Sequence, residues 1–219
     1  NISGDALSFS EVHADLIERW SEFDSEIYHG GHDSKFQLNL KSNYKLVVEN
    51  YCESYHLPWV HPGLNSYSRL EDHYNIVKYG KFSGQGTVLY SQFKDKNGQA
   101  AFPDFPNLSE KWNKGAEYIT VYPNVLLGVQ RDHAFAIIVE PKCYNETVEH
   151  IHFYYATHTT DAKNRKINAK QWKGVFEEDI FVVQGMQSGR HATSFDGGRF
   201  SPIMDEATHC YHDWVARKI

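Results

Sequence analysis

Two histidines, His56 and His61, lie close enough along the chain to bind one metal ion together. Pro58 stands between them and should end any helix that carries His56, so the chain can bend and bring the second imidazole toward the first. Two imidazoles alone do not complete a catalytic iron or zinc site, which takes a third protein ligand. The sequence therefore predicts a further ligand from elsewhere in the chain.

Asp179 is the best candidate for this third ligand. Apolar residues at helical spacing predict a helix over residues 168–188, and Asp179 falls on its inward stripe. The other inward positions are apolar: Trp172, Val175, Phe176, Val183 and Met186. A lone buried carboxylate is costly, so Asp179 should be paired with an arginine or a backbone cap, protonated, or bound to a cation. Glu177 and Glu178 lie off the stripe and are expected to face solvent.

Two histidines and one carboxylate form a facial triad that leaves several coordination positions open. This arrangement suits Fe(II), which must bind O2 beside a substrate. Zinc accepts the same ligands and would favour hydrolysis. The types of ligand alone do not separate iron from zinc.

Asn50 and Glu53 precede His56 in a segment where a second helix is expected, over residues 43–56. On such a helix the three residues stand at positions i, i+3 and i+6 and share one face. A polar face of this kind is also typical of a helix surface in contact with solvent. The second histidine after Pro58 favours the interpretation that this face belongs to a metal site.

The elements that must position these residues follow from periodicity and turn signals. The sequence predicts a helix over residues 8–28, a strand over residues 36–40, a loop over residues 94–112 and a last helix from Ser201-Pro202. Further strands are expected over residues 74–79, 87–93, 118–122, 124–130, 134–139 and 148–157. This order predicts an α+β fold in which helices pack on one curved antiparallel sheet, with residues 1–219 forming one domain.

Composition narrows the classes of function. The formal net charge is −6 and there is no basic run, so nucleic acid is not an expected partner. No apolar stretch approaches the roughly 18 residues of a membrane helix. Three widely separated cysteines favour a reducing compartment, here the cytoplasm, and the absence of any C-x-x-C pair excludes a zinc finger.

The segment from Asn43 to Pro62 resembles a known signature. It reads N-Y-K-L-V-V-E-N-Y-C-E-S-Y-H-L-P-W-V-H-P and is similar to the α-subunits of Rieske non-haem iron oxygenases, the aromatic-ring-hydroxylating dioxygenases. Glu178-Asp179, followed by Gln187, and the stretch from residue 122 to residue 133 resemble the same family. Tyr44 replaces a more usual tryptophan, and Gln184 stands where an acidic residue is common.

The resemblance implies a catalytic domain with the helix-grip fold and a mononuclear Fe(II) held by His56, His61 and Asp179. It also implies that Glu53 accepts a hydrogen bond from His56 and offers its other oxygen across a subunit boundary, giving electrons a short path. Asn50 resembles a residue near the family's iron. The expected reaction is O2-dependent hydroxylation, or oxidative demethylation, of a small organic molecule.

The [2Fe–2S] Rieske cluster of this family is not expected in the chain. Cys210-Tyr-His212 matches only half of the cluster motif, and Cys210 is expected to be a packing residue. The resemblance therefore implies an upstream Rieske domain, a homotrimer, and a reductase or ferredoxin that supplies electrons. A zinc-dependent hydrolase and a module that binds hydrophobic ligands without chemistry remain the alternatives.

Overall fold

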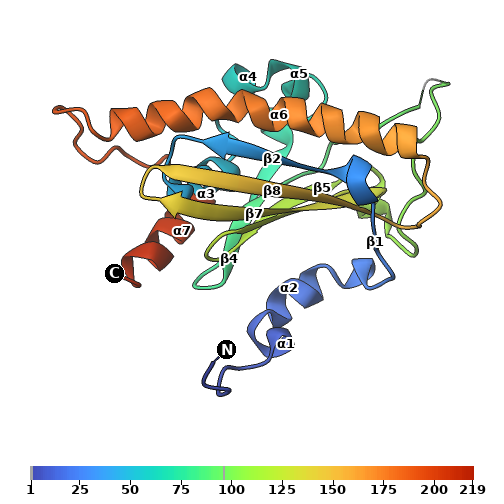
Figure 1. The fold of residues 1–219 in the computed structure, drawn as a ribbon, viewed down its shortest axis with the longest axis horizontal. Coiled ribbons are helices and arrows are strands. Elements are labelled where there is room, and N and C mark those ends of the chain that lie inside the picture. Colours follow the sequence, from blue (N-terminus) through green and yellow to red (C-terminus); the bar gives the residue numbers. More distant parts are fainter. Residues whose placement is uncertain (1, 96) are drawn as a thin grey trace.

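The computed structural model describes residues 2–95 and 97–219. Its centre is an eight-stranded antiparallel sheet in the order β1-β8-β7-β6-β5-β4-β3, with β2 also pairing with β8 (Figure 1). The strands are β1 (Tyr28–His29), β2 (Lys35–Leu40), β3 (His73–Lys78), β4 (Phe82–Thr87), β5 (Ala116–Val121), β6 (Val125–Val129), β7 (His133–Cys143) and β8 (Glu146–Tyr155). This arrangement confirms the predicted curved antiparallel sheet with helices packed on it.

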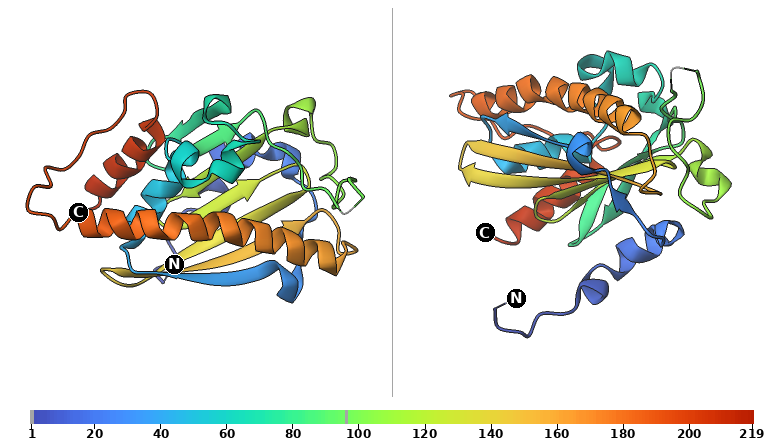
Figure 2. Two further views of the ribbon diagram at one scale, coloured as in Figure 1. Left: turned by 90° about the horizontal axis from the view of Figure 1, so that it is seen from above. Right: turned by 45° about the vertical axis from the view of Figure 1, so that its right-hand side comes forward.

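The helices differ greatly in length, and the longest lies across one face of the sheet. They are α1 (Phe9–Val12), α2 (Ala14–Arg19), α3 (Tyr44–Cys52), α4 (Leu57–Val60), α5 (Pro62–Asn65), α6 (Ala162–Gly189) and α7 (Glu206–Ala216). Figures 1 and 2 show α6 on one side of the sheet and α1 and α2 on the other. Within the described residues, none of these helices has the length and apolar character to cross a membrane.

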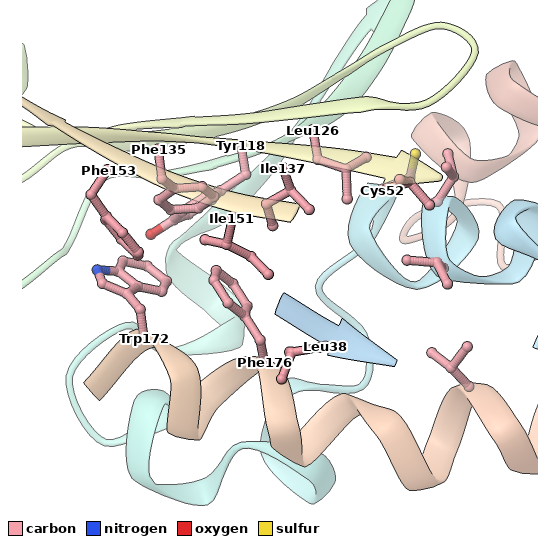
Figure 3. Packing of buried hydrophobic residues seen from close by; sticks show 14 of the residues in the cluster. Leu38, Cys52, Tyr118, Leu126, Phe135, Ile137, Ile151, Phe153, Trp172 and Phe176 are labelled. Atoms are coloured by element: carbon pink, nitrogen blue, oxygen red, sulfur yellow. The ribbon is translucent and has the colours of Figure 1, made fainter. Parts of the chain in front are cut away.

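The core lies between α6 and the face of the sheet that α6 covers. Trp172 and Phe176 of α6 pack against Phe135 of β7, with ring centroids 4.9 and 5.4 Å from it (Figure 3). On β8, Ile151 and Phe153 are fully buried and point to the same core. Burial of these large side chains is what fixes α6 against the sheet, since apolar area removed from water is the main favourable term in folding.

One predicted strand is wrong. Residues 88–93 form no strand, and β4 runs instead from Phe82 to Thr87. Two glycines concealed β4, because glycine is depleted in strands. Gly84 is required there: a Cβ atom at this position would lie 2.0 Å from the carbonyl oxygen of Tyr118 on β5.

Several predicted helix boundaries are also wrong. The segment 8–28 is broken into α1, α2 and a 3-10 turn over Ser21–Phe23, so it is not one amphipathic helix. The last helix begins at Glu206 rather than at Ser201-Pro202, because the Ser201 amide bonds to the Asp205 carboxylate at 2.6 Å and shapes a turn first. The long helix begins earlier than expected, at Ala162, where Asp161 caps it by accepting from the amide of Asn164.

Candidate metal centre

His56, His61 and Asp179 converge at one point, although the third residue is far from the others in sequence. One possible ligand atom from each lies within 4.8 Å of the others. Nε2 of His61 is 3.0 Å from Oδ1 of Asp179, and Nε2 of His56 is 3.5 Å from the same oxygen. The two histidines flank the short helix α4, and the middle of α6 supplies the aspartate.

The predicted shared helical face of Asn50, Glu53 and His56 is wrong, because α3 ends at Cys52. Glu53 has extended backbone angles, φ −124° and ψ 164°. Its Oε2 accepts from the amides of Tyr55 and His56, the latter at 3.2 Å, and these bonds start a new turn. The same turn brings Oε1 to 2.5 Å from Nδ1 of His56. The predicted contact between Glu53 and His56 is therefore present, but a turn creates it.

Pro58 was predicted to end a helix, but it lies at the start of one. It occupies the first turn of α4, where proline is tolerated because its missing amide hydrogen would be unsatisfied anyway. Since α4 is only 4 residues long, His61 follows directly after it. The imidazole rings of His56 and His61 lie 5.1 Å apart between centroids, at an angle of 69°.

Both histidines are held by carboxylates on the side away from the convergence point. Nδ1 of His61 donates to Oε2 of Glu178 at 2.7 Å, as Nδ1 of His56 donates to Glu53. The prediction that Glu178 only faces solvent is wrong, although 47% of its side chain is exposed. A histidine that binds a metal through one nitrogen usually donates its other N–H to a carboxylate or carbonyl. The carboxylate next to Asp179 in the sequence was therefore a candidate for this partner.

Asn50 touches the proposed site from α3. The side chain is buried, 7% exposed, and its Nδ2 donates to Oδ1 of Asp179 at 2.8 Å. This bond orients the carboxylate toward the two imidazoles. It also satisfies one lone pair of Oδ1, which leaves Asp179 capacity for one further partner at that oxygen.

Glu149 of β8 was missed, although it shares the inward face of Ile151. It lines a small cavity together with Asn50 and Asp179. The pKa of the Glu149 carboxyl group is raised from 4.5 to about 8, mainly by burial and to a lesser extent by the nearby charge of Asp179. The alternation of β8 could have revealed it, because the strand period places every second residue on the same face.

The donor set favours a cation at the convergence point. With both Nδ1 atoms donating to carboxylates, a neutral His61 would turn a lone pair toward the Asp179 carboxylate, which is unfavourable unless a proton or metal ion lies between. Burial lowers the pKa of His61, but the hydrogen bonds and charges of Asp179 and Glu178 together raise it above its usual value. Two imidazoles and one carboxylate in this arrangement fit a divalent transition metal.

The convergence point lies on the wall of a small, largely apolar cavity of about 60 Å³. Its wall includes Leu57, Leu64, Tyr118, Phe135, Trp172, Val175 and Phe176, with Ser68, His73 and Gln85 forming a polar corner. A neighbouring hollow shares Trp172 and Val175 and adds Tyr67, Tyr90 and Gln171. Phe102 and Phe105 of the predicted loop are instead buried, 3% and 2% exposed, and hold that loop to the core.

Residues 18–219 match the family described as the ring hydroxylating alpha subunit, catalytic domain. This match covers more than half of the chain, and the chain belongs to that family. The match confirms the resemblance to Rieske oxygenase α-subunits that the segment from Asn43 to Pro62 and the Glu178-Asp179 pair indicated.

Several characterised proteins are similar in sequence. Putrescine 2-hydroxylase of Bordetella bronchiseptica is 25% identical over 217 residues, covering 90% of this chain. The carnitine monooxygenase oxygenase subunit of Acinetobacter baumannii is 23% identical over 167 residues, covering 75% of this chain. The chain spans only 47% and 42% of the length of these two proteins.

Solved structures share the fold. A quaternary ammonium Rieske monooxygenase that oxidises carnitine superposes with a TM-score of 0.77 at 18% identity, covering 97% of this chain and 57% of the other. Naphthalene 1,2-dioxygenase from a Rhodococcus species superposes with a TM-score of 0.61 at 11% identity, covering 96% of this chain and 61% of the other. The predicted helix-grip catalytic domain is thereby confirmed as the fold.

Proposed function

We propose that this chain is the catalytic domain of a Rieske-type oxygenase that binds mononuclear Fe(II) through His56, His61 and Asp179. One observation carries the proposal: three ligands of the right types converge at the wall of a cavity in a chain of this family. When bound there, Fe(II) would supply the open coordination positions at which O2 is reduced beside the substrate.

The side chains around the triad have distinct parts in this proposal. Glu53 and Glu178 keep the two imidazoles oriented with Nε2 toward the metal position. Asn50 fixes the carboxylate of Asp179. Apolar residues such as Leu57, Val175 and Phe176 exclude water from the reacting centre, which protects reactive intermediates from side reactions.

For the substrate we propose a small aliphatic amine that is hydroxylated or demethylated. The named relatives act on putrescine and carnitine, both nitrogen compounds. The cavity agrees with such a substrate, because Ser68, His73 and Gln85 form a polar corner and the wall includes aromatic as well as aliphatic side chains. Among the described residues that line it, none is a lysine or an arginine. An ammonium group would meet aromatic faces and acceptors there.

The proposal also includes the partners implied by the family. Electrons would come from a reductase or ferredoxin through a [2Fe–2S] Rieske domain, and a trimer would bring one subunit's cluster to the next subunit's iron. Glu53 is 14% exposed at its side chain, so it lies close to the surface through which such a path would run. A cytoplasmic location stays a prediction.

Activity of the full-length protein tests this function. We expect NADH-dependent O2 uptake, in the presence of its reductase, that is coupled to oxidation of aliphatic amines. A panel of putrescine, carnitine, choline and naphthalene separates the substrate classes. Coupled oxidation of naphthalene alone would contradict the amine proposal, and zinc-dependent hydrolysis without O2 uptake would contradict the oxygenase itself.

A further inference from the structure

A chain of hydrogen bonds runs along the polar corner of the cavity and ends at Glu53. Ser68 Oγ is 3.0 Å from Nε2 of His73, and Nδ1 of His73 is 2.6 Å from Oε1 of Gln85. Nε2 of Gln85 then donates to the backbone carbonyl of Glu53 at 2.9 Å. His73 begins β3 and Gln85 lies on the paired strand β4, opposite Asn75, so the chain of bonds links the sheet to the turn that carries the first histidine.

The direction of each bond follows by elimination. The Glu53 carbonyl only accepts, so the amide of Gln85 must present its NH2 group to it and its oxygen to His73. That oxygen in turn only accepts, so Nδ1 of His73 must carry a proton. Burial, as the largest cause, lowers the pKa of His73, which favours the neutral ring with a bare Nε2 that accepts from the Ser68 hydroxyl.

The hydrogen bonds that join Ser68, His73 and Gln85 to Glu53 are buried, so they help to fix the position of the Glu53 turn. Ser68 is 1% exposed and Gln85 is 9% exposed. A buried amide or carbonyl that loses its partner costs free energy comparable to its full desolvation, so the Glu53 carbonyl is held firmly to β4. Glu53 is the residue whose carboxylate contacts His56 Nδ1 at 2.5 Å.

We propose that His73 is a positioning residue, which acts through Gln85 to hold the Glu53 turn so that the Glu53 carboxylate meets His56. The inference deepens the proposed function and rests on it for its catalytic meaning. His73 binds no metal in this scheme. The Nδ1 proton of His73 fixes the orientation of the Gln85 amide, and the Gln85 NH2 group holds the Glu53 backbone carbonyl in place. The Glu53 carboxylate then sets the orientation of the His56 ring.

The decisive measurement reads the His56 ring directly in the metal-free full chain. NMR of chain labelled with ¹⁵N-histidine should show a slowly exchanging proton on His56 Nδ1. His73→Leu and Gln85→Leu each break the chain of bonds, and both should abolish this signal. His73→Asn retains an amide donor near the Nδ1 position and should restore it. His150→Leu is a matched control on β8, where the ring bonds to Gln37 and Glu140 and not to the Glu53 turn.

Iron binding provides a second readout. His73→Leu should weaken Fe(II) affinity about 10-fold, at the low end for groups that support metal ligands, and His73→Asn should recover most of it. An unchanged His56 signal in both leucine variants, with folding confirmed by circular dichroism, would overturn the inference. A wild-type chain that shows the predicted signal pattern but takes up no iron would instead overturn the proposed function and leave the positioning role standing.

Discussion

Glu178 and His61 form a hydrogen bond of 2.7 Å between Oε2 and Nδ1, across the contact between α6 and the turn after α4. The neighbouring residue of Glu178 on α6 is Asp179, which faces the other nitrogen of the same ring. One helical segment therefore contacts both nitrogens of His61, and this fixes the ring more firmly than either contact alone.

Removing the carboxylate behind His61 should weaken metal binding without removing a ligand. We expect Glu178→Ala to lower Fe(II) affinity about 10-fold, because the ring loses the partner that fixes its orientation. Competition with a chromogenic chelator measures the change. Glu177→Ala is the matched control, since that side chain is 50% exposed and pairs only loosely with Lys173 at 3.5 Å. Equal losses in the two variants would show that Glu178 has no specific role.

The amide of Asn50 should matter through Asp179. Asn50→Ala removes the 2.8 Å bond that orients the carboxylate, so we predict an Fe(II) affinity about 10-fold lower than that of the wild type. Asn39→Ala, at an exposed position of β2, should have no effect. The prediction fails if calorimetric titration with Fe(II) gives the same affinity for the wild type and Asn50→Ala.

Residue type and family pattern were enough to predict the three residues that converge, but not how they are brought together. Asp179 could be found because a carboxylate interrupts an apolar stripe. Glu178 could not be placed from the stripe alone, since its partner His61 belongs to a turn whose path depends on the bonds of Glu53. His73 and Gln85 carry no local pattern, and only the pairing of β3 with β4 brings them to the site.

The fold was predictable where one period dominates the sequence. β8 alternates clearly, and α6 has a continuous apolar stripe. β4 could not be recognised, because the need for Gly84 comes from the close approach of the Tyr118 carbonyl on another strand. The broken N-terminal helix likewise depends on tertiary contacts: the side chains of Arg19 and Trp20 donate to the buried Glu117 of β5, each at 2.8 Å.

Glu149 should make the stability of the metal-free chain depend on pH. Its pKa rises from 4.5 in the unfolded chain to about 8 in the folded chain. Between these values the folded state keeps a proton that the unfolded state has lost. The free energy of unfolding contributed by this group therefore falls as pH rises through that window and is lowest above pH 8.

Glu149→Gln removes this dependence. The variant should be more stable than the wild type by up to about 5 kcal/mol at alkaline pH and nearly equal to it at acid pH, because glutamine needs no proton to stay neutral. Urea unfolding across the pH range measures the difference. Glu146→Gln, at an exposed position of the same strand, controls for loss of charge. A constant difference at every pH would show that Glu149 does not titrate as proposed.

Gly84 tests the packing of β4 against β5. Gly84→Ala should destabilise the chain by about 3 kcal/mol, since the added methyl group would collide with the backbone of Tyr118. Gly174→Ala is the contrasting variant: its Cβ meets nothing within 4 Å on the exposed side of α6. There alanine should stabilise the helix by about 0.5–1 kcal/mol. A mild effect of Gly84→Ala on the urea midpoint would mean that the two strands separate easily.

His56, His61 and Asp179 are expected to bind one iron ion between them. The most direct test is the metal content of protein reconstituted with Fe(II) under anaerobic conditions, for the wild type and for Asp179→Ala. We expect about one iron per chain in the wild type and a large loss in the variant, because a facial triad supplies three ligands and the substitution removes one of them. Unchanged iron binding in Asp179→Ala, or no transition metal in either protein, would contradict this expectation.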